Sequence, residues 1–385
     1  MNFYGKRILI AEGRARQSLP LSRAFRNLGC NVSALCGSKL DVSYASRFIN
    51  NKILGVCDNE RIDETTKQLK VLIETGIYDL VVPTTDFSAS ILSKNKSYLS
   101  KYTKVASNDW DIFRIASDKL KTMEVCMREN IPCPFTLSEV TDLNQVLNSH
   151  IRFPIVVKPR IGYGAIGFKI IHSKHQLVEL FKDGNDDLSL YVFQEFIPQT
   201  DIQYECAMFM DDNNDVKTSV VFSKNRWFPI DGGSSTLNIT VNRPDIVKSC
   251  TQLLKAIHWH GAADIDLIQD PRDNLAKIME INPRVSGSVK ICFDAGVNQA
   301  LQMLELAFGE PVTKYESYEA GCRLRCSQSD LLWFIKSPNR FKASPSWFSC
   351  YNTRDQIFTL SDPLPWFVFS LHGLLDYKKE MNKRK

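Results

Sequence analysis

The most constraining feature of this sequence is a pair of short apolar runs separated by a turn. The runs occupy 264–268 and 276–282, and the Pro-Arg-Asp-Asn stretch between them is typical of a turn. The pattern predicts a β-hairpin in which residue 266 opposes residue 280 and residue 264 opposes residue 282. Opposed residues share one face of a sheet, as do residues two apart on one strand. We therefore expect Asp266 and Glu280 to point to the same side, with Asn282 beside Glu280.

This arrangement predicts a cation site. Two carboxylates opposed across a strand pair repel each other, so a cation between them would stabilise the hairpin. Oxygen ligands without soft donors favour Mg²⁺ or Mn²⁺ that bridges to phosphate oxygens. We interpret Asp266, Glu280 and Asn282 as metal ligands, and the alternative is a solvated acidic hairpin end. Arg284 follows two residues later, where its planar donors could meet a transferred phosphate.

A second feature is a strand that ends in a lysine and runs into a glycine-rich loop. The strand 155–158 ends at Lys158, and Gly162, Gly164 and Gly167 follow it. Although GxGxxG spacing occurs in dinucleotide sites, a helix follows it there, whereas 168–171 continues here as a strand. We therefore expect a hairpin loop whose N–H groups can cover phosphates. The alternative is a flexible hairpin with an exposed lysine. A protein-kinase loop has the opposite order, because its lysine follows the glycines.

The N-terminal part alternates short apolar strands with helices. Strands are expected at 6–11, 31–35 and 78–83, with helices between them, so residues 1–107 predict an open parallel α/β sheet. The turn after the first strand has one glycine, Gly13, where a dinucleotide fingerprint needs three. A nicotinamide cofactor is therefore not expected.

Composition and charge indicate which classes of partner this chain is expected to have. A formal charge of +5 spread over 385 residues is weak, and the dense basic run is the C-terminal tail, which we interpret as a solvated end rather than a nucleic-acid arm. The chain has no apolar signal core and no run near the ~18 apolar residues of a spanning helix, so we expect a cytoplasmic protein without nucleic-acid or membrane partners. The eleven cysteines are scattered and never spaced as CxxC, which predicts reduced thiols.

Several of these motifs together resemble the ATP-grasp superfamily, in particular its carbamoyl-phosphate-synthase-like and amino-acid-ligase members. The motifs are Asp118-Lys119, the Lys158 strand with its glycine loop, the stretch 191–197 and the segment Glu-Ile-Asn-Pro-Arg at 280–284. The resemblance covers residues 1 to about 310. It implies an α/β fold with an N-terminal open parallel domain at 1–107 and a two-part ATP-grasp domain at 108–310. ATP would lie between the two parts, one of which is a lid at about 135–206, and 311–385 would be an appended subdomain.

The resemblance also implies roles for individual residues. Lys119 and Lys158 would contact the ATP phosphates beneath the loop of Gly162, Gly164 and Gly167, with Lys158 and Arg284 as catalytic groups. The residues expected to hold the nucleoside are Gln194, Glu195, Ile197 and Asp201. The residues expected to face the acceptor substrate are Arg226, Gly232, Gly233, Ser234 and Ser235. Asp201 and Asp266 stand where the family more often has glutamate, and both retain an oxygen ligand.

The implied activity is an ATP- and Mg²⁺-dependent carboxylate–amine ligase. It would phosphorylate a small carboxylate, join the acyl phosphate to an amine and release ADP and phosphate. Amino acids are candidate substrates, and a homodimer is left open. One alternative is a carbamoyl-phosphate-synthase-like enzyme that releases the phosphorylated product. The other is a nucleotide-binding regulatory protein without turnover.

Overall fold

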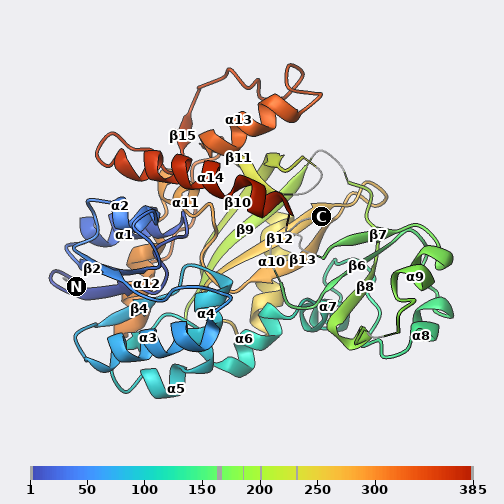
Figure 1. Cartoon of the computed structure of the whole chain (residues 1–385), viewed down its shortest axis with the longest axis horizontal. Coiled ribbons are helices and arrows are strands. Elements are labelled where there is room, and N and C mark those ends of the chain that lie inside the picture. The colour runs from blue at the N-terminus through green and yellow to red at the C-terminus, as the bar shows by residue number, and fades with distance from the viewer. Residues whose placement is uncertain (1–2, 163–166, 185, 200–201, 231–232, 383–385) are drawn as a thin grey trace.

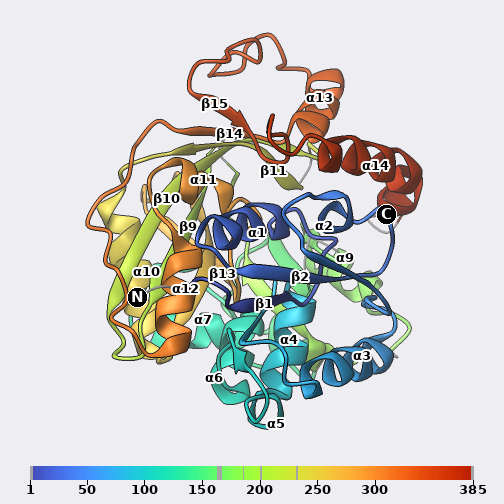
Figure 2. The ribbon, with the colours of Figure 1, turned by 90° about the vertical axis from the view of Figure 1, so that its left-hand side faces the viewer.

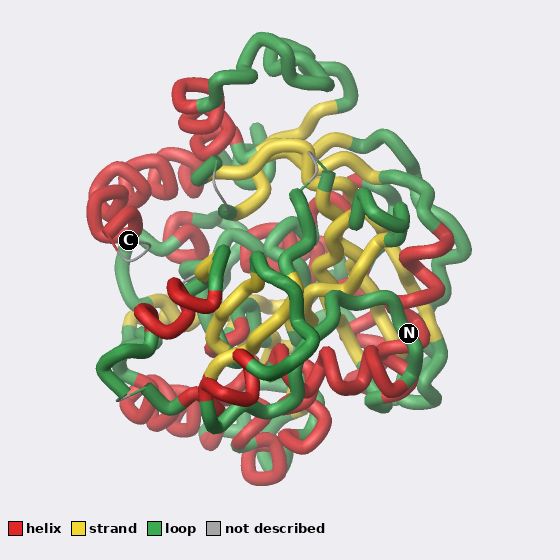
Figure 3. Tube along the Cα trace, turned by 90° about the vertical axis from the view of Figure 1, so that its right-hand side faces the viewer, coloured by secondary structure: helices red, strands yellow, loops and turns green. Residues whose placement is uncertain are grey.

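The computed structural model of the protein describes residues 3–162, 167–184, 186–199, 202–230 and 233–382, with side chains as far as residue 373 (Figure 1). The strands of these residues form sheets of five, three and seven strands, which we name the N-terminal, small and large sheets. Helices lie mainly on the outside of the strands (Figure 3). The predicted α/β class is confirmed.

The N-terminal sheet is parallel throughout, with strand order β3-β2-β1-β4-β5. Its strands are β1 (Arg7–Ile10), β2 (Asn31–Cys36), β3 (Asn51–Leu54), β4 (Leu80–Val82) and β5 (Lys104–Val105). The helices between them are α1 (Ser18–Asn27), α2 (Val42–Ala45), α3 (Ile62–Glu74), α4 (Asp86–Lys94) and α5 (Lys96–Leu99). This is the open parallel α/β arrangement that the alternating pattern predicted.

Both faces of the N-terminal sheet are covered, which explains why its strands are continuous apolar runs. On one face Phe25 of α1 packs in the same core as Met303 and Leu304 of α12 (Gln299–Phe308). On the other face Leu69 of α3 packs with Ile91 of α4. A helix from the later part of the chain thus closes the N-terminal sheet.

The small sheet has the order β7-β6-β8, and β6 is antiparallel to both neighbours. Helices α6 (Trp110–Ser117) and α7 (Lys119–Arg128) lead into it from the N-terminal sheet. Its strands are β6 (Ile155–Pro159), β7 (Lys169–Ile171) and β8 (Tyr191–Glu195), and its helices are α8 (Leu143–Leu147), α9 (Lys174–Leu180) and the 3₁₀ turn Leu188–Leu190. Because β6 and β7 pair directly, the glycine-rich segment is a hairpin loop, as predicted.

The large sheet has the order β13-β12-β9-β10-β11-β14-β15 and lies at the centre of the molecule (Figure 1). Its strands are β9 (Gln203–Met210), β10 (Val216–Phe228), β11 (Ser234–Thr240), β12 (Gly261–Gln269), β13 (Ala276–Asn282), β14 (Arg323–Arg325) and β15 (Thr353–Asp355). Helix α10 (Pro244–Ala256) packs Leu253 and Leu254 onto one face, and Ile291 of α11 (Lys290–Asp294) packs on the other.

The C-terminal part of the chain is joined to both of the larger sheets. Strands β14 and β15 continue the large sheet, and α13 (Ser327–Lys336) follows β14. Helix α14 (Leu364–Asn382) lies beside α2, where its Trp366 packs near Val42 (Figure 2). The proposed boundary at 310 therefore separates strands of one sheet, and the expected lid end at 206 falls inside β9. The domain limits stay predictions.

Candidate active site

The hairpin of β12 and β13 has the register that the sequence predicted. Asp266 opposes Glu280 and Asp264 opposes Asn282. The turn lies at Pro271–Asp273, between the two strands. The two carboxylates therefore stand side by side on one face of the large sheet, where they form part of a cavity wall.

Two lysine ammonium groups accompany these carboxylates. Lys224 of β10 ion-pairs with Asp266, and it also pairs with Glu205 of β9 at 2.8 Å. Lys119, the first residue of α7, pairs with Glu280 Oε2 at 3.1 Å. The sequence argument assigned the compensating charge to a metal alone. In the folded chain much of it comes from lysines, because neighbouring strands and α7 bring them to the hairpin.

Lys224 lies between two carboxylates and forms ion pairs with both. Glu205 opposes Asp266 across the β9–β12 pairing, so Lys224 faces two acids at once. Burial by itself would lower the pKa of Lys224, but the carboxylates of Asp266 and Glu205 raise it above its ordinary value. Burial by itself would also raise the pKa of Asp266, but Lys224 and the Asn282 amide lower it below its ordinary value. Lys224 and Asp266 are therefore both charged at neutral pH.

Asn282 and Arg284 connect the hairpin to the N-terminal sheet. Asn282 Nδ2 donates to Asp266 Oδ2 at 3.0 Å, and Arg284 Nη2 donates to Asn282 Oδ1 at 3.0 Å. The same nitrogen of Arg284 lies 3.2 Å from Asp86 Oδ2, at the start of α4. Although burial disfavours its charge, Asp86 and Asp264 raise the pKa of Arg284. Arg284 is thus a fixed cation between two domains.

Lys119 is held in place by local structure on both sides. Asp118 caps α7 by accepting from Leu120 N at 3.0 Å, and it ion-pairs with Arg160 at 2.7 Å. The Lys119 backbone N–H donates to the Arg160 carbonyl at 3.0 Å. The ammonium group of Lys119 also donates to the carbonyl of Gly162 at 2.7 Å. The start of the glycine loop is therefore tied to the hairpin through Lys119.

Lys158 lies in β6 of the small sheet and is 7% exposed. Burial lowers its pKa to about 8; nearby Glu280 opposes this change and Lys119 adds to it. No described residue makes a direct hydrogen bond or ion pair with its ammonium group. A buried ammonium that lacks a direct partner and lines a cavity is available to an anionic ligand.

These side chains line one cavity of about 350 Å³. Its walls come from two sheets and a loop: Lys158 and Glu195 from the small sheet, Asp266 and Lys224 from the large sheet, and Arg16 from the loop before α1. The volume is within the range of small-molecule sites. A phosphate-rich ligand would meet lysines on one side and paired carboxylates on the other.

The comparison with known families agrees with this geometry. The sequence pattern described as the ATP-grasp domain matches residues 116–288, which include the small sheet, β9–β13 and the whole hairpin. Residues 116–288 are an ATP-grasp domain.

Curated relatives of this domain are distant. D-aspartate ligase of Enterococcus faecium is 26% identical over 244 residues, which cover 57% of this chain and 56% of the relative. D-alanine–D-alanine ligase of Carboxydothermus hydrogenoformans is 26% identical over 187 residues, which cover 44% of this chain and 59% of the relative. The chain thus spans little more than half the length of these two relatives.

Solved structures share the fold of the ATP-grasp domain. The biotin carboxylase domain of Hydrogenobacter thermophilus 2-oxoglutarate carboxylase superposes with a TM-score of 0.68 at 15% identity, over 83% of this chain and 73% of that chain. N5-carboxyaminoimidazole synthetase of Staphylococcus aureus, complexed with ADP, superposes with a TM-score of 0.65 at 18% identity, over 83% and 81%. These similarities show that most of the chain shares its fold with these two proteins.

Most of the predicted site residues meet in the cavity of the ATP-grasp domain. Those that line it are Lys119, Lys158, Gly162, Glu195, Ile197, Gly233, Ser234, Ser235, Asp266, Glu280, Asn282 and Arg284. Gly164, Asp201 and Gly232 lie outside the described residues. Gly167 and Gln194 are described but do not line the cavity. Gly167 has φ of +74° and a Cβ there would lie 2.9 Å from Pro159, so the loop requires glycine at this position.

Gln194 lies behind the cavity wall rather than in it. Its side chain is fully buried, and its Nε2 donates to Thr136 Oγ1 at 2.8 Å. The neighbouring Glu195 does line the cavity and pairs with Arg272 at 3.0 Å. Alternation along β8 explains the difference, because successive side chains of a strand point to opposite faces. A direct ligand contact by the Gln194 side chain is therefore not supported.

Arg226 is a correction to the predicted substrate residues. It is 2% exposed, does not line the cavity, and forms a bidentate pair with Asp330 of α13 at 2.8 and 3.1 Å. The reason is a β-bulge in β10, where the register shifts between Lys224 and Arg226. A bulge inserts one extra residue and reverses the alternation of side chains. Lys224 therefore faces the cavity, and Arg226 two residues later faces away.

Sequence reasoning missed three residues of this site. Glu205 carried a usable signal, because it is a lone acid in the apolar strand β9. Lys224 carried no sequence signal that distinguished it from Arg226, because both are cations in the same strand. Arg16 is far away in sequence, and only the packing of the loop before α1 against Gly287 brings it to the cavity.

The described helices do not include one with the length and apolar character needed to cross a bilayer.

Proposed function

We propose that this chain is an ATP-dependent carboxylate–amine ligase that acts through an acyl phosphate and releases ADP and phosphate. The observation that carries the proposal is the convergence of Lys119, Lys158 and Arg284 on one cavity whose wall holds the opposed pair Asp266 and Glu280. The ligases among the relatives and the ADP complex among the structural neighbours support the same reading.

The nucleotide would lie between the small and large sheets. Lys158 has no direct partner among the described residues, and Lys119 is already oriented by Glu280 and the Gly162 carbonyl. Two ammonium groups at one end of a cavity suit the phosphates of a nucleoside triphosphate. Glu195 and Ile197 line the same cavity and would adjoin the nucleoside.

The hairpin residues fit a magnesium ion. Asp266, Glu280 and Asn282 carry side-chain oxygens suited to a hard cation, and Glu280 Oε1 has no partner among the described residues. The Asn282 oxygen at present accepts from Arg284, so it would have to exchange this contact for the ion. The described part of the chain contains no cluster of three or more His, Cys, Asp or Glu side chains able to hold a metal. These hairpin residues would hold a bound Mg²⁺, which would supply neutralisation of the phosphate charge.

The chain's own groups would act mainly by position and charge. The γ-phosphoryl group would pass from ATP to a carboxylate oxygen, and the amine would then attack the acyl carbon as phosphate leaves. Lys158 and Arg284 would stabilise negative charge on the transferred group, and the tether between Arg284 and Asp86 would keep its donors fixed during the step. No protein nucleophile is needed.

The carboxylate substrate would bind near Arg16. This side chain is half-buried at the cavity, beside Gly287, and forms no hydrogen bond or ion pair with another described residue. Lys119, Lys224 and Arg284 all have carboxylate partners. Arg16 is therefore suited to an anionic group of the substrate, and amino acids are the class favoured by the relatives.

The direct test is a mass-spectrometric screen of pooled amino acids and small acids with MgATP. We expect ADP, phosphate and a product that is lighter by one water than the sum of two inputs. Substrate-dependent AMP and pyrophosphate would contradict the acyl-phosphate route. Release of a phosphorylated acid without condensation would favour the carbamoyl-phosphate-synthase-like alternative, and nucleotide binding without any turnover would favour the regulatory one. A cytoplasmic location and a homodimer remain predictions.

A further inference from the structure

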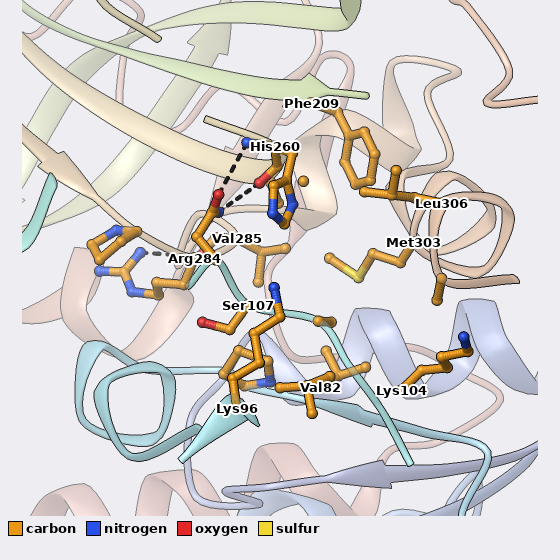
Figure 4. A pocket seen from close by; sticks show the side chains of 18 of the residues that line it. Val82, Lys96, Lys104, Ser107, Phe209, His260, Arg284, Val285, Met303 and Leu306 are labelled. Carbon is orange, nitrogen blue, oxygen red and sulfur yellow. Dashed lines mark hydrogen bonds between the residues drawn. The ribbon is translucent and has the colours of Figure 1, made fainter. Parts of the chain in front are cut away.

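A second cavity, of about 320 Å³, lies outside the residues that would hold the nucleotide and the metal (Figure 4). It is formed where β4 and the edge strand β5 of the N-terminal sheet meet β9, β12 and α12. Lys96, Ser107 and His260 line one part of it, and Phe209, Met303 and Leu306 line another. The cavity is therefore amphipathic, with a polar end and an apolar end.

The polar end contains donors that the protein does not fully use. Lys96 pairs with Asp109 at 3.1 Å, but Asp109 is 72% exposed, so this ion pair is weak. The His260 backbone is held by Asn108 through contacts of 2.7 and 3.2 Å. Its imidazole has no hydrogen-bond partner among the described residues.

His260 is neutral at physiological pH. Burial and the Lys96 ammonium lower its pKa to about 4, and Asp109 and Asp212 oppose this change. A neutral imidazole keeps one N–H that can be donated to an acceptor. Lys96 and His260 together would therefore receive a carboxylate without needing a proton from the solvent.

The charged side chains around the second cavity favour an anionic ligand. Asp212 is the only carboxylate that lines the cavity in the described part of the chain, and it is exposed, whereas Lys96, Lys104 and Arg284 are cations, of which Arg284 is already paired with Asp86. The apolar end would bury the body of a ligand, which is favourable by about 25 cal/mol per Å² of apolar surface. The best match is a small monocarboxylate with an apolar body.

The second cavity shares one wall with the first. Pro283, Arg284 and Val285 line it, and Arg284 also lines the nucleotide cavity. Arg284 Nη1 donates to the Val285 carbonyl at 3.0 Å, while its Nη2 donates to Asn282. A ligand that presses on this segment would act on both the Asn282 contact and the Asp86 contact.

We propose that this second cavity is a regulatory site for a small apolar monocarboxylate, whose binding changes the nucleotide affinity of the first cavity through Pro283, Arg284 and Val285. The ligand would also join the N-terminal and large sheets, because both contribute walls. Coupling between two sites is reciprocal, so nucleotide would change the affinity for the carboxylate by the same factor.

Binding can be tested without nucleotide by titrating the full chain calorimetrically with hexanoate, hexanol and hexylamine. We expect hexanoate to bind at least tenfold more tightly than the other two. Lys96→Met should weaken hexanoate at least tenfold, and Lys101→Met, a matched exposed lysine outside the cavity, should change it less than twofold. Ala307→Leu should abolish binding by filling the apolar end. Equal affinity for hexanol, or an unchanged affinity in Lys96→Met and Ala307→Leu, would overturn the site.

The proposed coupling between the two cavities is tested by titrating the protein with MgADP in the presence and absence of saturating hexanoate. We expect the Kd for MgADP to change at least threefold, the Kd for hexanoate to change by the same factor in the reverse experiment, and both changes to disappear in Lys96→Met. An unchanged Kd for MgADP at saturating hexanoate would overturn the coupling. Because the hexanoate titration needs neither nucleotide nor turnover, its result stands apart from the proposed ligase activity.

Discussion

Lys224 and Arg226 lie two residues apart on β10, and both are buried cations paired with carboxylates, yet their surroundings differ. Lys224 faces Asp266 and Glu205 at the wall of a cavity. Arg226 faces Asp330 inside a closed contact with α13. Burial lowers the pKa of Arg226 and raises the pKa of Asp330 even though the two attract each other. The pKa of Lys224, in contrast, is raised by Asp266 and Glu205 against the effect of burial. A perturbed pKa therefore occurs at both places, and only the cavity wall distinguishes a binding group from a structural one.

The largest expected effect concerns the carboxylates that Lys224 and Lys119 accompany. Asp266→Asn and Glu280→Gln should each lower ADP formation by ~100-fold or more, because each removes a negative charge that would hold the Mg²⁺ needed to neutralise phosphate charge. The double variant should be little worse than either single variant, since the two act as one unit. The measurement is steady-state ADP release with the substrate found by the screen. Additive losses would show that the carboxylates act independently.

Lys224→Met and Arg226→Met test the comparison itself. Lys224→Met should lower turnover by ~100-fold, because Asp266 and Glu205 then repel each other at the site. Arg226→Met should leave turnover per folded molecule almost unchanged but destabilise the chain by about 3 kcal/mol, since it leaves Asp330 with a weaker set of partners. Thermal unfolding and ADP release measured on the same samples separate the two outcomes.

A matched control is available for that pair. Asp330→Asn in the Arg226→Met background removes a buried charge that has lost its bidentate partner and keeps only Arg325 and Thr236, so it should restore part of the lost stability. If Arg226→Met instead raises the KM for substrate in a fully stable protein, Arg226 belongs to the site and the comparison fails.

Arg16→Ala should raise the KM for the carboxylate about tenfold, because one charge-assisted contact to the substrate is lost. The KM for ATP should stay within about twofold, since we assign Arg16 to the carboxylate rather than to the nucleotide. Arg14→Ala is the control: this arginine is exposed in the same loop and does not line the cavity. Equal effects of the two substitutions would remove Arg16 from the site.

The smallest expected effect is a pH dependence from Lys158. Because its pKa in the free protein is about 8, kcat/KM for ATP should fall severalfold as pH rises from 8 to 9. Lys158→Arg should shift this fall to higher pH. An unchanged pH profile in Lys158→Arg would show that another group controls the fall.

The pH dependence of the free energy of unfolding provides an independent check on the lowered pKa of Lys158. The unfolded lysine has a pKa near 10.4, so between pH 8 and about 10.4 the unfolded chain binds more protons than the folded one. Lys158 therefore contributes a free energy of unfolding that rises with pH across this window. Lys158→Met should remove that slope.

The local sequence pattern was enough to predict those parts of the protein in which residues close in sequence also lie close in space. The hairpin register of Asp266 with Glu280 followed from a turn and a period of two, and the β6–β7 loop followed from a strand after the glycines. The N-terminal parallel sheet followed from alternating strands and helices. For the hairpin and the β6–β7 loop the deciding forces, strand alternation and turn geometry, act within about 20 residues. The N-terminal sheet also needs the pairing of β1 with β4, which lies far away in sequence.

Tertiary structure alone decided the charge partners of the site. A bulge in β10 exchanged the roles of Lys224 and Arg226, and it depends on pairing with β11, which the order of residues does not reveal. The β9–β12 pairing placed Glu205 against Asp266, and packing of the first loop against Gly287 brought Arg16 to the cavity. Compensation of buried charge is a property of spatial neighbours. The sequence could therefore identify the carboxylates of the hairpin but not the lysines that neutralise them.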